Sequence, residues 1–303
     1  MSSADTSIDL SAETPSGKGA KDENFPVGSF LLPKHLRPHV ATYYAFARAI
    51  DDVADNPDLS SDEKIARLRG FEAVLRGSVS NSGGYEKAEN LRASMLETNV
   101  AVRHGADLIT AFVQDSTQSR YRDWTGLIGY CENSANPVGR YLLDLHGEDP
   151  AGYAQSDALS TVLQILNHLQ DCGDDLREMA RCYIPTDWLE EEGSSIEDVR
   201  ADALTPELRR VIDRMLDGCE DMMEEARALA PALKSRHLAM ESQVIVNLAS
   251  RLLKRLRKGD PLAMRVALTK SDFAMAGTGG AIAGFFRAGT LKRQSDEKTG
   301  RAA

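Results

Sequence analysis

One stretch of this sequence places acids and amides at helical spacing within an apolar segment. Asp171 and Asp175 follow Gln164 and Asn167, and the residues between them are largely leucine and isoleucine. A helix turns by about 100° per residue, so these four side chains and His168 share a stripe roughly 100° wide. Carboxylates and carboxamides on one face of an otherwise apolar helix predict a multivalent cation with a polyanionic ligand.

A second stretch, residues 44–55, has the same character. Tyr44, Arg48, Asp51 and Asp55 share a stripe roughly 60° wide. Carboxylates at i and i+4 repel each other by a few tenths of a kcal/mol, and a bound Mg²⁺ turns that cost into a benefit. Two acidic pairs on two apolar helices therefore predict a metal–diphosphate cluster held between them, with Arg48, Gln164 and Asn167 toward the phosphate.

The acidic spacing alone is a weak signal, because the chain repeats it at Asp213, Asp217 and Asp221. There the acids share a face with Glu220 and Glu224, and apolar residues lie opposite. That pattern is typical of a solvated helix face. The first two stretches differ because their flanks are apolar and because tyrosine, arginine and amide side chains lie in line with the acids.

The remaining candidates for chemistry are weaker. His168 could orient the metal ligands or be a hydrogen-bonded core histidine, and the sequence leaves both open. The basic run 251–258 is typical of a solvated helix end, favoured there by the helix dipole. Phosphate neutralisation by Arg251 or Lys254, or contact with an anionic membrane surface, stays an alternative. There is no HExxH spacing, GxSxG motif or P-loop.

Composition limits the class of protein. The 303 residues are 42% hydrophobic and 27% charged, as in ordinary soluble globular proteins. The net charge of −10 argues against nucleic acid as the main ligand, so positive charge for phosphate chemistry must be recruited locally. Four cysteines without CxxC spacing indicate reduced thiols and a cytoplasmic location. We expect neither a signal peptide nor a transmembrane helix.

The predicted architecture is all-α and single-domain, because no period-2 strand pattern occurs. We expect a disordered segment at 1–22, a helical domain at 23–286, and a basic flexible tail at 287–303. Residues 184–204 are predicted to be an exposed excursion. The predicted helices span about 36–55, 61–75, 86–102, 105–119, 123–146, 156–180, 205–229 and 235–257.

Several motifs, taken in order, resemble the squalene and phytoene synthase family of isoprenoid enzymes. They are Arg48–Asp55, Gly129-Tyr-Cys131 with Val138-Gly139, the 164–175 stretch and Tyr183-Ile-Pro185, and the resemblance runs from about 23 to 273. It implies an isoprenoid-synthase helical bundle around a central apolar cavity. It also implies that Asp51, Asp55, Asp171 and Asp175 hold Mg²⁺, and that Tyr44 and Tyr130 lie near the reacting carbons.

Within the family the chain most resembles the hydroxysqualene synthases of bacterial hopanoid synthesis. The closer match lies in Glu23–Val27, Arg120–Trp124, Ser134–Arg140 and Gly259–Ala263. It implies the conversion of presqualene diphosphate and water to hydroxysqualene and diphosphate. Gln170, where the family commonly has arginine, and Asp22–Phe25, in place of its Ser-x-Ser-Phe, put in doubt a condensation starting from farnesyl diphosphate.

Two alternatives to this function stay open. The first is a squalene or phytoene synthase that condenses two prenyl diphosphates. The second is a non-catalytic relative that serves as a binding or assembly protein, although all four acidic positions are present. Because the implied C30 substrate is apolar, we also predict loose contact with the inner face of the membrane, or with neighbouring enzymes of the squalene pathway, through residues 273–286.

Overall fold

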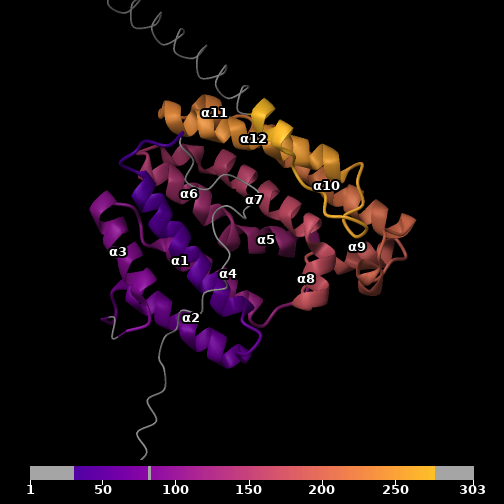
Figure 1. Cartoon of the computed structure of the whole chain (residues 1–303), viewed down its shortest axis with the longest axis horizontal. Helices are drawn as coiled ribbons and strands as arrows, with labels where there is room; N and C mark the ends of the chain where they lie inside the picture. Colours follow the sequence, from indigo (N-terminus) through magenta and orange to yellow (C-terminus); the bar gives the residue numbers. More distant parts are fainter. Residues whose placement is uncertain (1–30, 81–82, 277–303) are drawn as a thin grey trace, which may run out of the picture.

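The computed structural model describes residues 31–80 and 83–276, and that part of the chain is helical without a β-strand (Figure 1). Its helices are α1 (Arg37–Asp55), α2 (Ser61–Arg76), α3 (Glu86–Thr98), α4 (Arg103–Asp115), α5 (Trp124–Ser134), α6 (Asn136–Leu145), η1 (Pro150–Gly152), α7 (Tyr153–Gln170), α8 (Cys172–Glu178), α9 (Thr186–Glu191), η2 (Ile196–Arg200), α10 (Pro206–Ala226), α11 (Leu229–Ala232) and α12 (Arg236–Leu256). The predicted all-α fold is confirmed.

Local sequence signals set several helix ends. Ser60 and Glu63 form a reciprocal capping box at the start of α2. Thr205 caps α10 by accepting a hydrogen bond from the Leu208 N–H, and Pro206 follows it at the first helical position. These predicted starts are confirmed.

Two predicted helices are each split in two. The helix expected over 123–146 breaks at Ala135 into α5 and α6, because Pro137 cannot continue the hydrogen-bond ladder from α5. The helix expected over 156–180 begins at Tyr153 and breaks at Asp171, whose φ of −107° and ψ of 9° are not helical. The break at Asp171 changes the direction in which the second acidic pair points.

The excursion predicted over 184–204 is partly wrong. This segment forms α9 and η2, and Leu189 and Val199 are buried in the core. The acid-rich sequence hid these two anchors, because one buried side chain per short helix gives no periodic signal. The prediction for α10 holds, because Asp217 and Asp221 are exposed whereas Met215 and Cys219 are buried.

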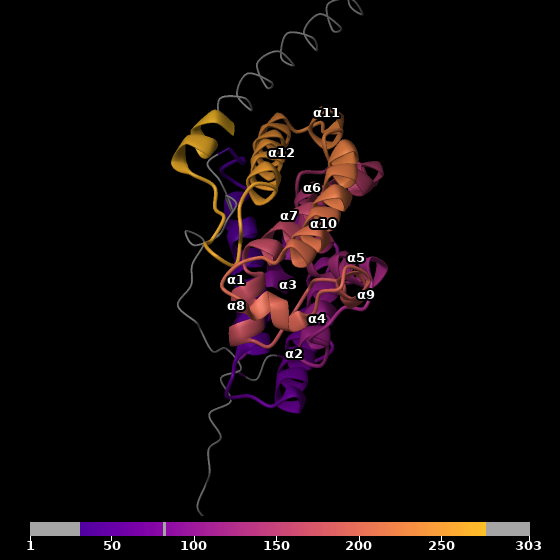
Figure 2. The same ribbon diagram turned by 90° about the vertical axis from the view of Figure 1, so that its right-hand side faces the viewer.

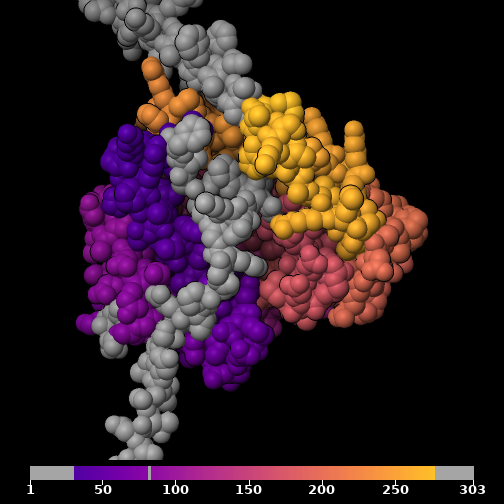
Figure 3. Space-filling model, viewed as in Figure 1, coloured from indigo at the N-terminus to yellow at the C-terminus, as the bar shows by residue number. Residues whose placement is uncertain are grey.

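The helices form two groups that meet at the middle of the molecule. In one group α1 packs against α2, α3 and α4; in the other α7 packs against α5, α6, α10 and α12 (Figures 1 and 2). The space-filling view shows indigo α1 and α2 on one side of the face and coral α8 with the orange and yellow C-terminal segments on the other (Figure 3). The polar stripes predicted for residues 44–55 and 164–170 therefore lie on α1 and α7, one from each group.

Two further expectations concern the whole chain. All four cysteines are buried and free of disulfides. No helix among residues 31–80 and 83–276 is long and apolar enough to cross a membrane. The segments predicted to be disordered or flexible, 1–22 and 287–303, lie outside the described residues, as do the ends of the predicted helical domain and most of 273–286.

Candidate active site

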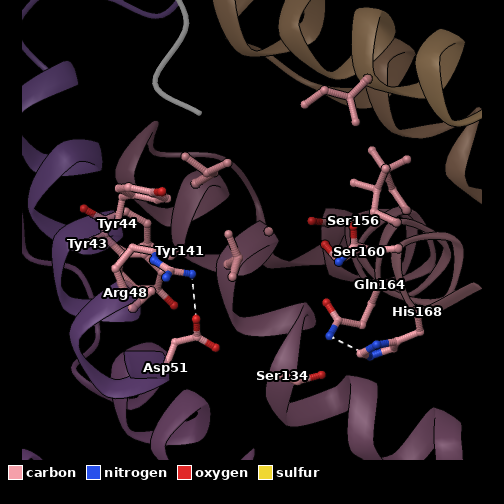
Figure 4. Close-up of a pocket in the computed structure, with 18 of the residues that line it drawn as sticks. Tyr43, Tyr44, Arg48, Asp51, Ser134, Tyr141, Ser156, Ser160, Gln164 and His168 are labelled. Atoms are coloured by element: carbon pink, nitrogen blue, oxygen red, sulfur yellow. Dashed lines mark hydrogen bonds and ion pairs between the residues drawn. The ribbon is translucent and has the colours of Figure 1, made fainter. Parts of the chain in front are cut away.

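A cavity of about 540 Å³ lies between α1 and α7, and both predicted stripes contribute to its wall. Figure 4 shows Tyr44, Arg48 and Asp51 on one side and Gln164 with His168 on the other. Of the nine residues predicted for the site, eight line this cavity: Tyr44, Arg48, Asp51, Asp55, Tyr130, Gln164, Asn167 and Asp175. Asp171 is not among the lining residues.

The α1 wall carries a dense set of charges. The Arg48 guanidinium contacts Asp51 at 2.6 Å and Asp52 at 2.9 Å. Burial, followed by repulsion from Asp55, raises the pKa of Asp51 to about 7 in spite of the nearby arginine. Burial and the neighbouring carboxylate therefore both disfavour the ionised form of Asp51.

Arg181 is a site residue that the sequence analysis missed. It lies beyond α8, after Ala180, which adopts a left-handed φ of 54°. Its guanidinium contacts Asp55 at 2.6 Å and donates to the Ala54 carbonyl at 3.2 Å. Arg181 also lines the cavity. Its only sequence signal is its position two residues before the Tyr183-Ile-Pro185 motif.

The α7 wall is organised around His168. The Gln164 amide donates to His168 Nε2 at 3.0 Å, and His168 Nδ1 lies 3.8 Å from Asp175 Oδ2. The imidazole stacks on the Tyr183 ring with centroids 3.5 Å apart. His168 is thus a hydrogen-bonded residue of the cavity wall, as one of the two interpretations predicts. Its role in orienting a metal ligand stays a prediction.

Asp171 does not line the cavity and contacts a later segment of the chain instead. Its carboxylate lies 3.3 Å from the Arg265 guanidinium. The neighbouring Gln170 side chain is buried and donates to the Val266 carbonyl at 2.6 Å, so it does not line the cavity either. Both residues hold the segment after α12 against the junction of α7 and α8.

Tyr130 brings a second missed residue into the site. Its hydroxyl donates to Asp115 Oδ2 at 2.7 Å, and Asp115 lines the cavity from the end of α4. Burial raises the pKa of Asp115 to about 6, although Arg181 lowers it. The Tyr130 ring lies 5.3 Å from that of Tyr121 and 5.6 Å from that of Tyr183, which gives this part of the cavity an aromatic wall.

The rest of the cavity is mainly apolar and runs toward α6, α11 and α12. Its apolar lining includes Val40, Phe112, Val138, Leu142, Leu159, Leu163, Leu229, Leu238 and Ile245. Arg251 and Lys254 are absent from the lining, and Arg251 instead lies 3.6 Å from Asp272. The two residues suggested for phosphate neutralisation thus lie away from this cavity.

Comparison with known proteins agrees with this arrangement. The chain is 39% identical to hydroxysqualene synthase of Rhodopseudomonas palustris over 268 residues, 88% of this chain and 91% of that protein. It is also 39% identical to hydroxysqualene synthase of Zymomonas mobilis, over 85% of this chain and 86% of that protein. Against presqualene diphosphate synthase of the same organism the identity is 28%, over 76% of this chain and 73% of that protein.

Solved structures share the fold. The crystal structure of squalene synthase HpnC from Alicyclobacillus acidocaldarius matches with a TM-score of 0.69 and 31% identity, covering 77% of this chain and 87% of that one. A family model described as squalene/phytoene synthase matches residues 19–272. The chain therefore belongs to the squalene/phytoene synthase family.

Proposed function

We propose that this protein is a hydroxysqualene synthase, which converts presqualene diphosphate and water to hydroxysqualene and diphosphate with Mg²⁺. The observation that carries the proposal is one cavity with an acidic, arginine-bearing end and a long apolar body. A prenyl diphosphate has the same division into a charged head and an apolar chain. The relatives named hydroxysqualene synthase, at 39% identity over most of the chain, support this member of the family.

We propose that Asp51 and Asp55 on α1 and Asp175 on α8 hold Mg²⁺, together with Asp171 if its side chain leaves Arg265. The residues fit such an ion, because burial and then repulsion from Asp55 raise the pKa of Asp51, and a bound cation would relieve that repulsion. Among the described residues no three metal-ligating side chains already form a ready cluster. Bound Mg²⁺ would neutralise the diphosphate and so stabilise it as a leaving group.

The two arginines of the site are proposed to change partners when substrate binds. Arg48 and Arg181 contact the carboxylates Asp51 and Asp55 in this structure. A planar guanidinium binds phosphate oxygens as well as carboxylate oxygens, so both arginines can move to the diphosphate. Gln164 and Asn167 on the facing wall would orient the same group through their amides.

The apolar body is proposed to shelter the cation left when diphosphate departs. The faces of Tyr44 and Tyr130 would stabilise its positive charge. The buried Asp115, which accepts a hydrogen bond from the Tyr130 hydroxyl, would add to that stabilisation. Exclusion of bulk water would restrict the capture of the cation to one site and prevent mixed products.

Product analysis tests this proposal. The protein is incubated with Mg²⁺ and presqualene diphosphate in water enriched in ¹⁸O, and in parallel with farnesyl diphosphate alone. We expect ¹⁸O-labelled hydroxysqualene from the first substrate and little turnover of the second. Efficient formation of a C30 hydrocarbon from farnesyl diphosphate would instead identify a condensing synthase, and no turnover of either would favour a binding protein.

We further propose a peripheral contact with the membrane near the C-terminal segment. Three large apolar side chains there are exposed: Met264, Phe273 and Met275. Exposed apolar side chains suit contact with a lipid surface, from which the apolar C30 substrate would enter the protein. Flotation with anionic lipid vesicles tests the contact, and F273A should weaken it, whereas V79A, at another exposed apolar residue, should not. Association with other enzymes of the pathway stays a prediction.

A further inference from the structure

We propose that Arg120 is a positioning residue for Arg181, the arginine proposed to move from Asp55 to the diphosphate. This inference rests on the proposed function and adds the residue that holds Arg181 in place. Arg120 lies in the segment between α4 and α5 and is absent from the cavity lining. It would therefore act on the site through the chain and not by contact with the substrate.

The backbone turns sharply just before Arg181. Ala180 has a φ of 54°, a left-handed conformation that a residue with a Cβ atom adopts only at a cost in free energy. Glycine would adopt this conformation freely, but the chain has alanine here. Among the described residues the only other non-glycine residue with a positive φ is Asn99, and asparagine tolerates that conformation well. Contacts with the rest of the chain must therefore hold the turn at Ala180.

The Arg120 side chain supplies such a contact. Its Nη1 donates hydrogen bonds to the Ala180 carbonyl and to the Ser119 carbonyl, the latter at 2.6 Å. The Cys182 N–H donates to the same Ser119 carbonyl at 3.0 Å. The two residues on either side of Arg181 are thus both tied to residues 119 and 120.

The segment that contains Arg120 is itself held in the fold. It runs parallel to the segment after α8, where Arg120 pairs with Cys182. The Tyr121 carbonyl accepts a hydrogen bond from the Thr186 N–H at 3.0 Å, and the Tyr121 ring is buried. Arg120 therefore connects the left-handed turn to a part of the fold that is fixed by the core.

This turn directs Arg181 toward the acidic end of the cavity. Arg181 is 8% exposed, and its guanidinium contacts Asp55 at 2.6 Å. Its backbone N–H donates to the Asp175 carbonyl at 3.1 Å. Because the backbone is held beside Asp175, the side chain can exchange Asp55 for a diphosphate without movement of the chain. Loss of the Arg120 contact would let the turn leave the left-handed region and would carry the guanidinium away from the site.

A double-mutant cycle on the rate of diphosphate release tests this link. We expect R120A to slow release from presqualene diphosphate about fivefold and R181Q about tenfold or more. If Arg120 acts through Arg181, its loss has no further effect once Arg181 is gone, so R120A/R181Q should release within about threefold of R181Q. R122A, at an exposed arginine in the same segment, is the matched control and should release as the wild type does.

Urea denaturation of the same variants tests the link without turnover. If Arg120 positions Arg181, R181Q should lower the unfolding free energy less in the R120A background than in the wild type. Effects on release that multiply, or wild-type release in R120A, would overturn the positioning role while the proposed function stands. If the wild-type protein releases no diphosphate, the proposed function fails, and additive effects on the unfolding free energy would then overturn the link between the two arginines as well.

Discussion

Replacing Asp115 by asparagine should stabilise the protein while impairing its activity. Burial raises the pKa of this carboxyl from 3.8 to about 6, so the folded state binds its proton more tightly than the unfolded state does. Stability from this group is complete below pH 3.8 and is lost as pH rises through 6. A difference of about two pKa units corresponds to about 3 kcal/mol at pH 8, and to about half of that at pH 5.

The neutral asparagine removes this penalty and can still accept the hydrogen bond that Tyr130 now donates at 2.7 Å. Urea denaturation of metal-free protein at pH 5 and pH 8 measures the effect, with D217N, at an exposed acid of α10, as the control. We expect the gain in unfolding free energy to be larger at pH 8 and diphosphate release to fall. A gain that is the same at both pH values, or a loss at pH 8, would refute the reasoning.

Three further predictions follow from the site and the fold. D51N and D175N should each abolish diphosphate release while circular dichroism shows an intact fold. D217N changes an acid that also belongs to an i,i+4 pair but lies on a solvated face, so it should not affect release. Full activity of both site variants would refute the metal assignment. R181Q leaves the partly buried Asp55 without its cation, so we expect a loss of about 1–2 kcal/mol in urea denaturation and at least tenfold slower release. Wild-type release would contradict its proposed role. T205A removes the α10 cap and should cost about 1 kcal/mol without changing the products.

The sequence predicted those parts of the site that a single helix determines. Tyr44, Arg48, Asp51 and Asp55 lie along α1, and Gln164 and Asn167 lie along α7, so helical periodicity alone placed each set on one face. The apolar flanks correctly distinguished these faces from the solvated acids of α10. The all-α class followed from the same periodicity, because no strand pattern competed with it, whereas the bundle around a cavity was implied by the family resemblance.

Tertiary contacts decide the remainder. Arg181 meets Asp55 across 126 residues, and no local pattern around an isolated arginine indicates such a contact. Asp115 reaches the cavity because α4 ends against α5, where Tyr130 contacts it. Asp171 turns to Arg265 because the helix breaks there, and a helical wheel drawn through residues 164–175 assumes that it does not.

The two wall helices both bring negative partial charge to the acidic end of the cavity. α1 ends at Asp55 and α7 ends at Gln170, so both present their C-terminal ends, which carry partial negative charge, to the same region. α1 has no basic residue in its last turn and carries Asp52 and Asp55 there instead, with Asp51 just before them, contrary to the usual favourable placement. An anionic diphosphate could approach these acidic helix ends only if positive charge lay between the diphosphate and the helix ends. Arg48 and Arg181 supply part of that charge from the chain, and we propose that Mg²⁺ bound with the substrate supplies the remainder.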